Sequence, residues 1–205
     1  GAVRAEYDHE SLFEILDAGM VAHVGVPTPE GPIVLPMAYG RSSEHLYLHG
    51  AAANAMLRRA IGTDVCATVT ILDGLVVARS PFHNSMNYRS VVVRGVATEV
   101  EGSDAQRAAL RLISNHVVQT WETGRPPTDV EIRRTLVLRV PLVEMSGKVR
   151  TGGPSGDEPG DIEGPHWAGH VQVECDWGAP VRAHDLSPGI EPPSAVTELQ
   201  GRRLR

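Results

Sequence analysis

A pair of long β-forming runs, separated by one short polar connection, constrains the fold of this chain more than any other feature. The runs span residues 64–82 and 86–102 and are rich in Val, Thr and Ile, which favour extended backbone. Asp73-Gly74 within the first run is a typical hairpin or bulge sequence. Strands that follow each other so closely favour antiparallel pairing, because a parallel connection needs a crossover of about a dozen residues.

The other elements expected from the sequence are shorter. Hydrophobic periodicity and cap residues predict helices at 8–19, 51–62 and 103–121 and from 128 or 129 to 134, and strands at 20–27, 32–40, 45–50 and 135–149. Ser103 and Asp104 are the expected caps of the third helix. Pro36 implies that its strand lies at a sheet edge or carries a bulge, since proline cannot donate to a ladder.

This order of elements predicts a fold that is mainly β. Hairpin-like turns connect most of the strands, whereas a doubly wound parallel sheet would need a helix between nearly every strand pair. The sequence also contains neither a GxGxxG nor a GxxxxGKS/T nucleotide-binding loop. The predicted architecture is therefore an antiparallel β-barrel with helices packed outside it.

The composition changes near position 150. From there Gly and Pro dominate, and residues 166–178 carry two tryptophans that indicate an anchored segment. The expected organisation is one domain over residues 1–185 and a C-terminal tail over residues 186–205. The tail is interpreted as mobile or as an arm on a partner subunit.

Charge and hydropathy exclude several classes of partner. The chain has 205 residues, 41% of them hydrophobic, and a net charge of -6, whereas a nucleic-acid-binding surface is basic. No apolar run approaches the roughly 20 residues that a membrane span needs, and residues 1–10 lack the apolar core of a signal peptide. We therefore expect no nucleic-acid or membrane partner and a cytoplasmic location.

The densest polar cluster, residues 79–90, spans the connection between the two long β runs and the adjoining end of each. It contains one His, two Asn, three Ser, one Tyr and two Arg. Such side chains are costly to bury without partners and are common in ligand sites. A solvated connection with turn-forming Asn and Ser is the alternative interpretation.

Four separate stretches resemble one family. They are LYLHG (46–50) followed by a helix, LDGLVVARSPFHNSMNYRSVVVRGVA (72–97), KVRTGGPSGDE (148–158) and HWAG (166–169). From about residue 8 to about residue 190 the chain resembles pyridoxamine 5′-phosphate oxidase-like flavin-binding split-barrel proteins. The resemblance is to the branch that is grouped with nitroimidazole-resistance proteins.

The resemblance implies a six-stranded antiparallel split barrel and a homodimer with two cofactor sites at its interface. The usual cofactor of the family is FMN, and some relatives hold haem or the deazaflavin F420 instead. The implied site residues are Val34, Leu35, Pro36 and Met37 along the flavin ring, His49, Gly50, Ala51, Ala52 and Asn54 near the phosphate, Ser85, Asn87, Tyr88 and Arg89 on the polar strand, and Lys148, Arg150 and Trp167 from the partner subunit.

The phosphate turn departs from the family pattern. Relatives of this branch commonly carry Ser or Thr after His-Gly and Lys or Arg at the start of the next helix, whereas this chain has alanine at positions 51–53. The N–H groups of a helix N-terminus would remain as anion donors. The first cations of the segment are Arg58 and Arg59, and each lost charge-assisted hydrogen bond costs about 1.5–3 kcal/mol.

His49 has three interpretations. It is a structural residue whose ring bonds a neighbouring loop, a contact to cofactor or substrate, or a haem ligand. His83 and His170 compete with it for the haem role. No metal site is assigned. The sequence contains no recognisable nucleophile–base pair and no paired catalytic carboxylates, so no catalytic residue is assigned either.

Three functional hypotheses follow. The first is an FMN-binding oxidoreductase that passes electrons between a reduced nicotinamide cofactor and an unidentified small molecule. The second is a haem-binding split-barrel protein, because haem needs the hydroxyl groups of the turn less than FMN does. The third is a cofactor-free dimeric ligand-binding relative, which only the alanine turn supports.

Overall fold

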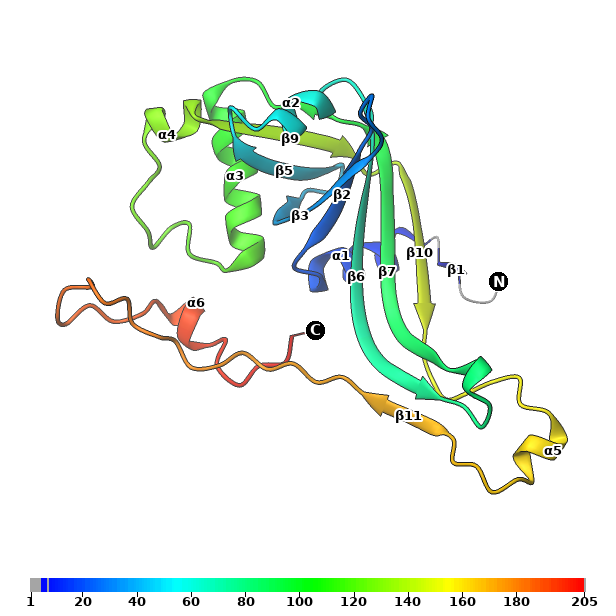
Figure 1. The fold of residues 1–205 in the computed structure, drawn as a ribbon. Coiled ribbons are helices and arrows are strands. Elements are labelled where there is room, and N and C mark those ends of the chain that lie inside the picture. The colour runs from blue at the N-terminus through cyan, green and yellow to red at the C-terminus, as the bar shows by residue number, and fades with distance from the viewer. Residues whose placement is uncertain (1–4, 7, 205) are drawn as a thin grey trace.

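The computed structural model of the chain describes residues 5–6 and 8–204 (Figure 1). The strands are β1 (Ala5–Glu6), β2 (Ala22–Val26), β3 (Ile33–Met37), β4 (Tyr39–Arg41), β5 (His45–Ala51), β6 (Asp64–Val77), β7 (Ser85–Val96), β8 (Thr98–Glu99), β9 (Thr135–Pro141), β10 (Glu144–Arg150) and β11 (Gly169–Gln172). The helices are α1 (His9–Ala18), α2 (Ala55–Ala60), α3 (Ser103–Val117), α4 (Asp129–Arg133), α5 (Pro159–Ile162) and α6 (Ser194–Thr197), with a 3-10 turn, η2, at Pro81–His83. Residues 1–4 and 7 of the predicted domain and residue 205 of the predicted tail lie outside the described residues.

The strands form two antiparallel sheets. One sheet has the order β1-β10-β7-β6-β2-β3, with β11 also pairing with β6, and the other has the order β4-β5-β9-β8. The predicted fold class, a mainly β antiparallel split barrel with flanking helices, is confirmed. Pro36 lies in β3, at the edge of its sheet, as its missing N–H predicted.

Three predicted strands are wrong in the same way, because each is two strands that belong to different sheets. Residues 32–40 form β3 and β4, residues 86–102 include β7 and β8, and residues 135–149 form β9 and most of β10. At each of these corners the chain crosses from one sheet to the other. Both sheets face the same apolar core, so the hydrophobic pattern continues through the corner and does not mark it.

The long hairpin of β6 and β7 belongs to two parts of the molecule. Its first half pairs with β2 in the barrel, from Ala22↔Val69 to Gly25↔Cys66. Its far half projects from the barrel and pairs with β11 (Figure 1). We call this far half together with β11 the arm. The expected irregularity at Asp73-Gly74 is a bulge, and a Cβ on Gly74 would stand 2.6 Å from the Val171 carbonyl oxygen of β11.

Local capping explains where the helices begin. The Asp8 carboxylate accepts a hydrogen bond from the Ser11 amide and starts α1, as predicted. The predicted caps of α3 are wrong, because Gly102 at φ +87° is the N-cap and Ser103 is already helical. Helix α2 is shorter than predicted, because residue 51 still belongs to β5 and the Asn54 side chain caps the helix.

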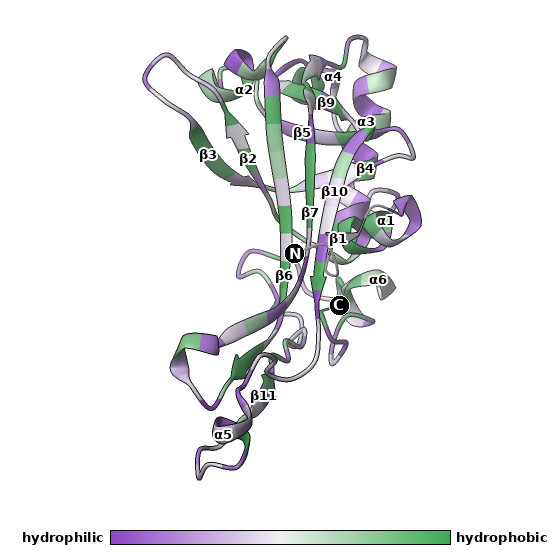
Figure 2. Ribbon diagram, turned by 90° about the vertical axis from the view of Figure 1, so that its right-hand side faces the viewer, coloured by the Kyte–Doolittle hydropathy of each residue, from purple (hydrophilic) through white to green (hydrophobic). Residues whose placement is uncertain are grey.

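The barrel core lies between the two sheets and is closed by α1 and α2. Its almost completely buried members include Leu12, Leu16, Val24, Leu46, Leu48, Leu57, Val69, Val91 and Leu138. Within the described part of the chain, no helix is long and apolar enough to cross a membrane. Hydrophobic residues also run along the outer strand β3, which the core does not cover (Figure 2).

A buried polar cluster joins α1, β4 and α3. The Gly19 carbonyl oxygen accepts hydrogen bonds from the Tyr39 hydroxyl at 2.9 Å and from Nε2 of His116 at 2.7 Å. The two rings pack against each other with centroids 4.5 Å apart. A carbonyl only accepts, so Nε2 of His116 carries the proton. Burial lowers the pKa of His116 and raises the pKa of Tyr39.

We expect the free energy of unfolding to decrease as the pH falls below about 6.5, the ordinary pKa of histidine. The lowered pKa of His116 means that the unfolded chain binds this proton first, which favours unfolding at lower pH. Urea unfolding at pH 8, 6.5 and 5 measures the slope, and His116→Gln, which keeps an amide donor, should flatten it. Equal slopes for wild type and His116→Gln would contradict this assignment.

Candidate functional site

Strand β5 is covered on both faces, which places His49 opposite the barrel core. Leu46 and Leu48 point into the core, whereas Tyr47 and His49 alternate onto the side of α3. Gly40 on the adjacent β4 allows α3 to approach closely, because a Cβ there would stand 2.6 Å from the Ile113 amide nitrogen. His49 therefore faces a helix that is held tightly against the sheet.

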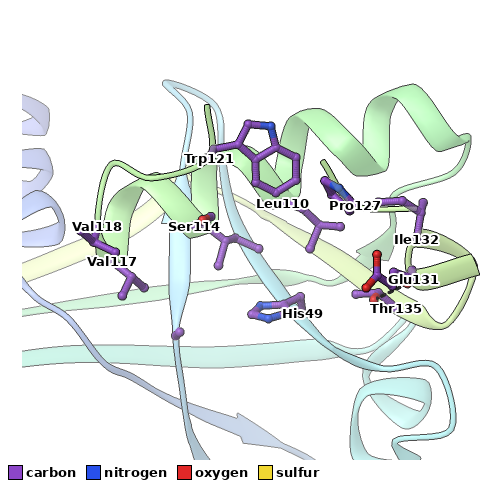
Figure 3. Close-up of a pocket in the computed structure, with 12 residues that line it drawn as sticks. His49, Leu110, Ser114, Val117, Val118, Trp121, Pro127, Glu131, Ile132 and Thr135 are labelled. Carbon is purple, nitrogen blue, oxygen red and sulfur yellow. Dashed lines mark hydrogen bonds between the residues drawn. The ribbon is translucent and has the colours of Figure 1, made fainter. Parts of the chain in front are cut away.

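A cavity of about 430 Å³ lies between α3, α4 and the β5–β9 strand pair (Figure 3). We call it the His49 cavity. Its volume is in the range of small-molecule and cofactor sites, and its walls are mostly apolar. The lining residues are Ala38, His49, Leu110, Ile113, Ser114, Val117, Val118, Trp121, Pro127, Glu131, Ile132 and Thr135.

His49, which lines this cavity, carries an unpaired polar atom. Its Nδ1 is buried and has no hydrogen-bond partner, which is unusual for a buried nitrogen. The interpretation of His49 as a structural residue bonded to a neighbouring loop therefore has no support at Nδ1. Burial lowers the pKa of His49, so its ring is neutral at pH 7. A neutral imidazole with an available nitrogen is a good ligand for a metal ion and a good acceptor for a donor group.

Glu131, the carboxylate of the cavity wall, is already committed to other partners. It accepts hydrogen bonds from the Arg125 guanidinium at 2.6 Å and from the Thr128 amide at 2.7 Å. The hydrogen bond from Arg125 is the main reason that the pKa of Glu131 falls to about 2. Glu131 therefore stays ionised and completes a capping box for α4, and it is not a proton donor for a ligand.

The segment between α3 and α4 covers the cavity and is tied down by polar contacts. The Asn115 side chain accepts a hydrogen bond from the Trp121 amide at 3.1 Å. Arg107 donates to the Pro127 carbonyl oxygen at 2.7 Å and pairs with Asp129 at 2.6 Å. These contacts hold the Trp121 indole at the cavity wall (Figure 3).

Backbone amides of the predicted phosphate turn already donate hydrogen bonds to carbonyl groups of the protein. The Ala52 amide donates to the Arg134 carbonyl at 2.8 Å, and the Asn54 amide donates to the Ala51 carbonyl at 2.8 Å. Gly50 leaves room for the Leu57 side chain, because a Cβ on residue 50 would stand 2.6 Å from a Leu57 methyl carbon. The Arg58 guanidinium of α2 folds back to the Ala52 carbonyl, so a cation from the helix lies at the turn.

The predicted residues on β7 and β10 come together at the base of the arm. Arg150 and Asn87 are both buried, and the guanidinium donates to the Asn87 side chain at 2.6 Å. Tyr88 lies under Lys148, whose Nζ is 5.8 Å from the ring centroid. Arg89 forms a two-pronged ion pair with Asp73 of β6, with a shortest distance of 2.7 Å. Ser85 also belongs to β7, and pairs with Val76 of β6.

The remaining predicted residues lie elsewhere. Val34, Leu35, Pro36 and Met37 lie in β3, on the far side of β2 from the hairpin. Trp167 is exposed just before β11. Of the three candidate haem ligands, His49 alone lines the cavity, whereas His83 is in η2 next to the arm and His170 is exposed on β11.

The cavity wall opposite His49 is the part of the site that sequence reasoning missed. Leu110, Ile113, Ser114 and Val117 belong to one face of α3, and their spacing at three and four residues resembles an ordinary core stripe. The sequence feature that could have indicated this wall is the length of the stripe, which continues past the end of α3 to residue 121. An extended apolar face of this kind covers more than one layer of the fold.

Comparison with known proteins identifies chains with this fold. The family model described as pyridoxamine 5′-phosphate oxidase matches residues 8–149. A comparison with curated proteins gave no match. Among solved structures, a flavocytochrome from Azotobacter vinelandii is 33% identical, with a TM-score of 0.91, and the match covers 97% of this chain and 92% of that one.

Two further structures are informative. A protein from Mycobacterium smegmatis described as binding FAD and haem is 31% identical, with a TM-score of 0.92, and the match covers 98% of this chain and 99% of that one. A protein from Bacteroides thetaiotaomicron, described as a putative 5-nitroimidazole antibiotic resistance protein, is 28% identical, with a TM-score of 0.60. That match covers 71% of this chain and 86% of the other.

Proposed function

This chain belongs to the pyridoxamine 5′-phosphate oxidase family, and we propose that it is a flavin-binding oxidoreductase. The observation that carries the proposal is the exposure of β3. Every residue from Ile33 to Pro36 is exposed, and Val34 is 58% exposed. An apolar strand at a sheet edge offers a flat surface and free backbone groups to a planar ring.

A bound flavin would supply the redox chemistry, and the protein would supply binding and orientation. Val34 and Leu35 would contact the ring, and Arg58 at the alanine turn would bind a phosphate in place of the missing hydroxyl groups. The proposed reaction transfers electrons from a reduced nicotinamide cofactor to a small organic acceptor.

The purified protein tests this proposal directly. We expect flavin absorbance bands and release of the flavin on heating, with chromatography before and after phosphodiesterase treatment separating FMN from FAD. FMN is the flavin that the family resemblance predicts, whereas the Mycobacterium smegmatis structure is described with FAD. If the protein stayed colourless after incubation with millimolar FMN or FAD and removal of the free flavin, the proposal would be contradicted.

The His49 cavity favours a second function, the binding of haem. Haem is a large apolar ring with a metal that needs an axial ligand. The cavity offers apolar walls and a neutral imidazole whose Nδ1 has no partner, so the residues present fit the group. Two structures that match nearly the whole chain are described as a flavocytochrome and as an FAD- and haem-binding protein. We propose that His49 is the axial ligand in this chain.

The arm supports the further proposal that the protein is a homodimer. Leu75, Met86 and Val171 lie side by side across its three strands, and each is about half exposed. Covering such a face releases about 25 cal/mol for each square ångström of apolar surface. A second copy of this chain, which presents the same arm and the same exposed β3, is the partner that we propose.

Leu75→Asp and Met86→Asp should each convert the dimer into a monomer, because a carboxylate on this face would be buried without a partner. Size-exclusion chromatography with light scattering measures the mass. Val143→Asp is the matched control, since Val143 is 82% exposed at the turn between β9 and β10. A monomeric mass for the wild-type protein would contradict the proposed dimer.

A further inference from the structure

The last residues of the described chain fold into a small hook. The Trp177 amide donates to the Arg202 carbonyl at 3.0 Å, and the Leu204 amide donates to the Cys175 carbonyl at 2.7 Å. Asp176 and Arg203 form an antiparallel bridge. We call residues 174–177 with residues 201–204 the C-terminal hook. It returns the end of the chain to the barrel, although it follows a long extended segment (Figure 1).

A second cavity, of about 910 Å³, separates the hook from the ends of α1 and α3. Arg202, Arg203 and Trp177 of the hook line one side of it, and Met20, His116 and Val117 line the other. Val117 also lines the His49 cavity. The two cavities therefore share a wall residue in the last turn of α3. One has mostly apolar walls, and the other carries two guanidinium groups.

This pairing matches the two chemical halves of haem, an apolar ring and two carboxylate side chains. We propose that Arg202 and Arg203 bind the propionates of a haem whose ring occupies the His49 cavity. The inference rests on the proposed haem binding and adds the residues that hold its anionic end. The planar guanidinium of arginine fits a carboxylate with two parallel hydrogen bonds.

The present partners of the two arginines do not prevent this role. Arg202 pairs with Glu198 at 3.4 Å, and Arg203 pairs with Glu174 at 2.6 Å, with all four side chains more than half exposed. Exposed ion pairs of this kind contribute little to stability, so exchanging them for a ligand carboxylate costs little. Asp17, the carboxylate on the wall of this cavity, is held by Arg41, which offsets its charge.

The distribution of charge and the extent of the similar structures support the same assignment. Arginine occupies three of the last four positions of a chain whose net charge is -6. The hook lies beyond residues 8–149, which the family model matches. The two structures that cover 97% and 98% of the chain are described with a haem or as a flavocytochrome, whereas the resistance protein covers 71%.

Haemin titration of the full chain tests the proposal. The double variant Arg202→Glu/Arg203→Glu should bind haemin at least tenfold more weakly, with an unchanged Soret position because the axial ligand is retained. Arg202→Lys/Arg203→Lys should recover part of the affinity. Haemin dimethyl ester, which lacks the two carboxylates, should bind wild type and double variant equally when both are titrated in the same dilute detergent. Arg94→Glu, at an exposed ion pair on β7, is the control for a change of net charge.

The outcomes separate this inference from the proposal on which it rests. If wild-type protein causes no shift of the haemin Soret band, haem binding and the role of the hook are both overturned. Wild type that binds haemin while the Arg202→Glu/Arg203→Glu variant binds equally well overturns the hook alone. An equal loss with haemin and with its dimethyl ester also overturns the hook, because the effect would then not involve propionates.

Discussion

His49→Ala is expected to lower the affinity of the protein for haemin by about a hundredfold or more and to shift the Soret band. Loss of a residue that only orients a metal ligand typically costs about 10–100-fold, and loss of the ligand itself should cost at least as much. The substitution removes a nitrogen that has no hydrogen-bond partner, so the fold loses no polar contact at that atom. Absorbance titration with haemin measures both the affinity and the band position.

The other two candidate ligands are the matched controls for this result. His83→Ala and His170→Ala should leave the spectrum unchanged, because neither residue lines the cavity. Free imidazole added to the His49→Ala protein should restore the original band if it fills the space that the side chain left. If His49→Ala kept the wild-type spectrum, or if His170→Ala lost the Soret band, the axial ligand would be a residue outside the His49 cavity.

Gly40→Ala is expected to destabilise the protein by about 3 kcal/mol, near the upper end of overpacking costs. The new Cβ would stand 2.6 Å from the carbonyl carbon of Leu112 and from the amide nitrogen of Ile113. These are backbone atoms of α3, so no side-chain rotation relieves the clash and the helix must move. Urea unfolding at neutral pH measures the change.

The same substitution should also disturb the site, since Ile113 lines the His49 cavity. A movement of α3 away from β4 would widen the cavity and weaken any ligand that fills it. Gly178→Ala is the control, because its Cβ would meet no heavy atom within 4 Å, and its stability should stay within about 1 kcal/mol of wild type. A Gly40→Ala protein as stable as Gly178→Ala would show that α3 is not held as closely as described.

The features that could be predicted from the sequence are those with a local physical cause. Pro36 marked an edge strand because it lacks a donor, and Asp73-Gly74 marked the bulge at which β11 approaches. The antiparallel pairing of β6 and β7 followed from their short connection. The corners at which strands change sheets left no such mark, because the apolar pattern runs through them.

The His49 cavity could not be predicted because its walls are distant in sequence. His49 of β5 meets residues 110–118 of α3 and its end, Trp121 of the following segment and residues 131–135 of α4 and β9. The sequence left His49 with three interpretations, and the unpaired Nδ1 leaves the structural one without support at that atom. The C-terminal hook was equally hidden, since Arg202 and Arg203 reach the barrel only by returning along a long extended segment.

The strand order also determines when this protein can complete its fold during synthesis. The β6–β7 hairpin is local in sequence, whereas β5 must wait for β9, with His45 opposite Pro141, and β1 must wait for β10, with Ala5 opposite Lys148. Such distant pairings are slow, because the loop closes before any contact rewards it. Until residues near 150 leave the ribosome, the apolar strands of the first half have no complete sheet to join. The nascent chain is therefore at its most aggregation-prone before β11 and the hook have been synthesised.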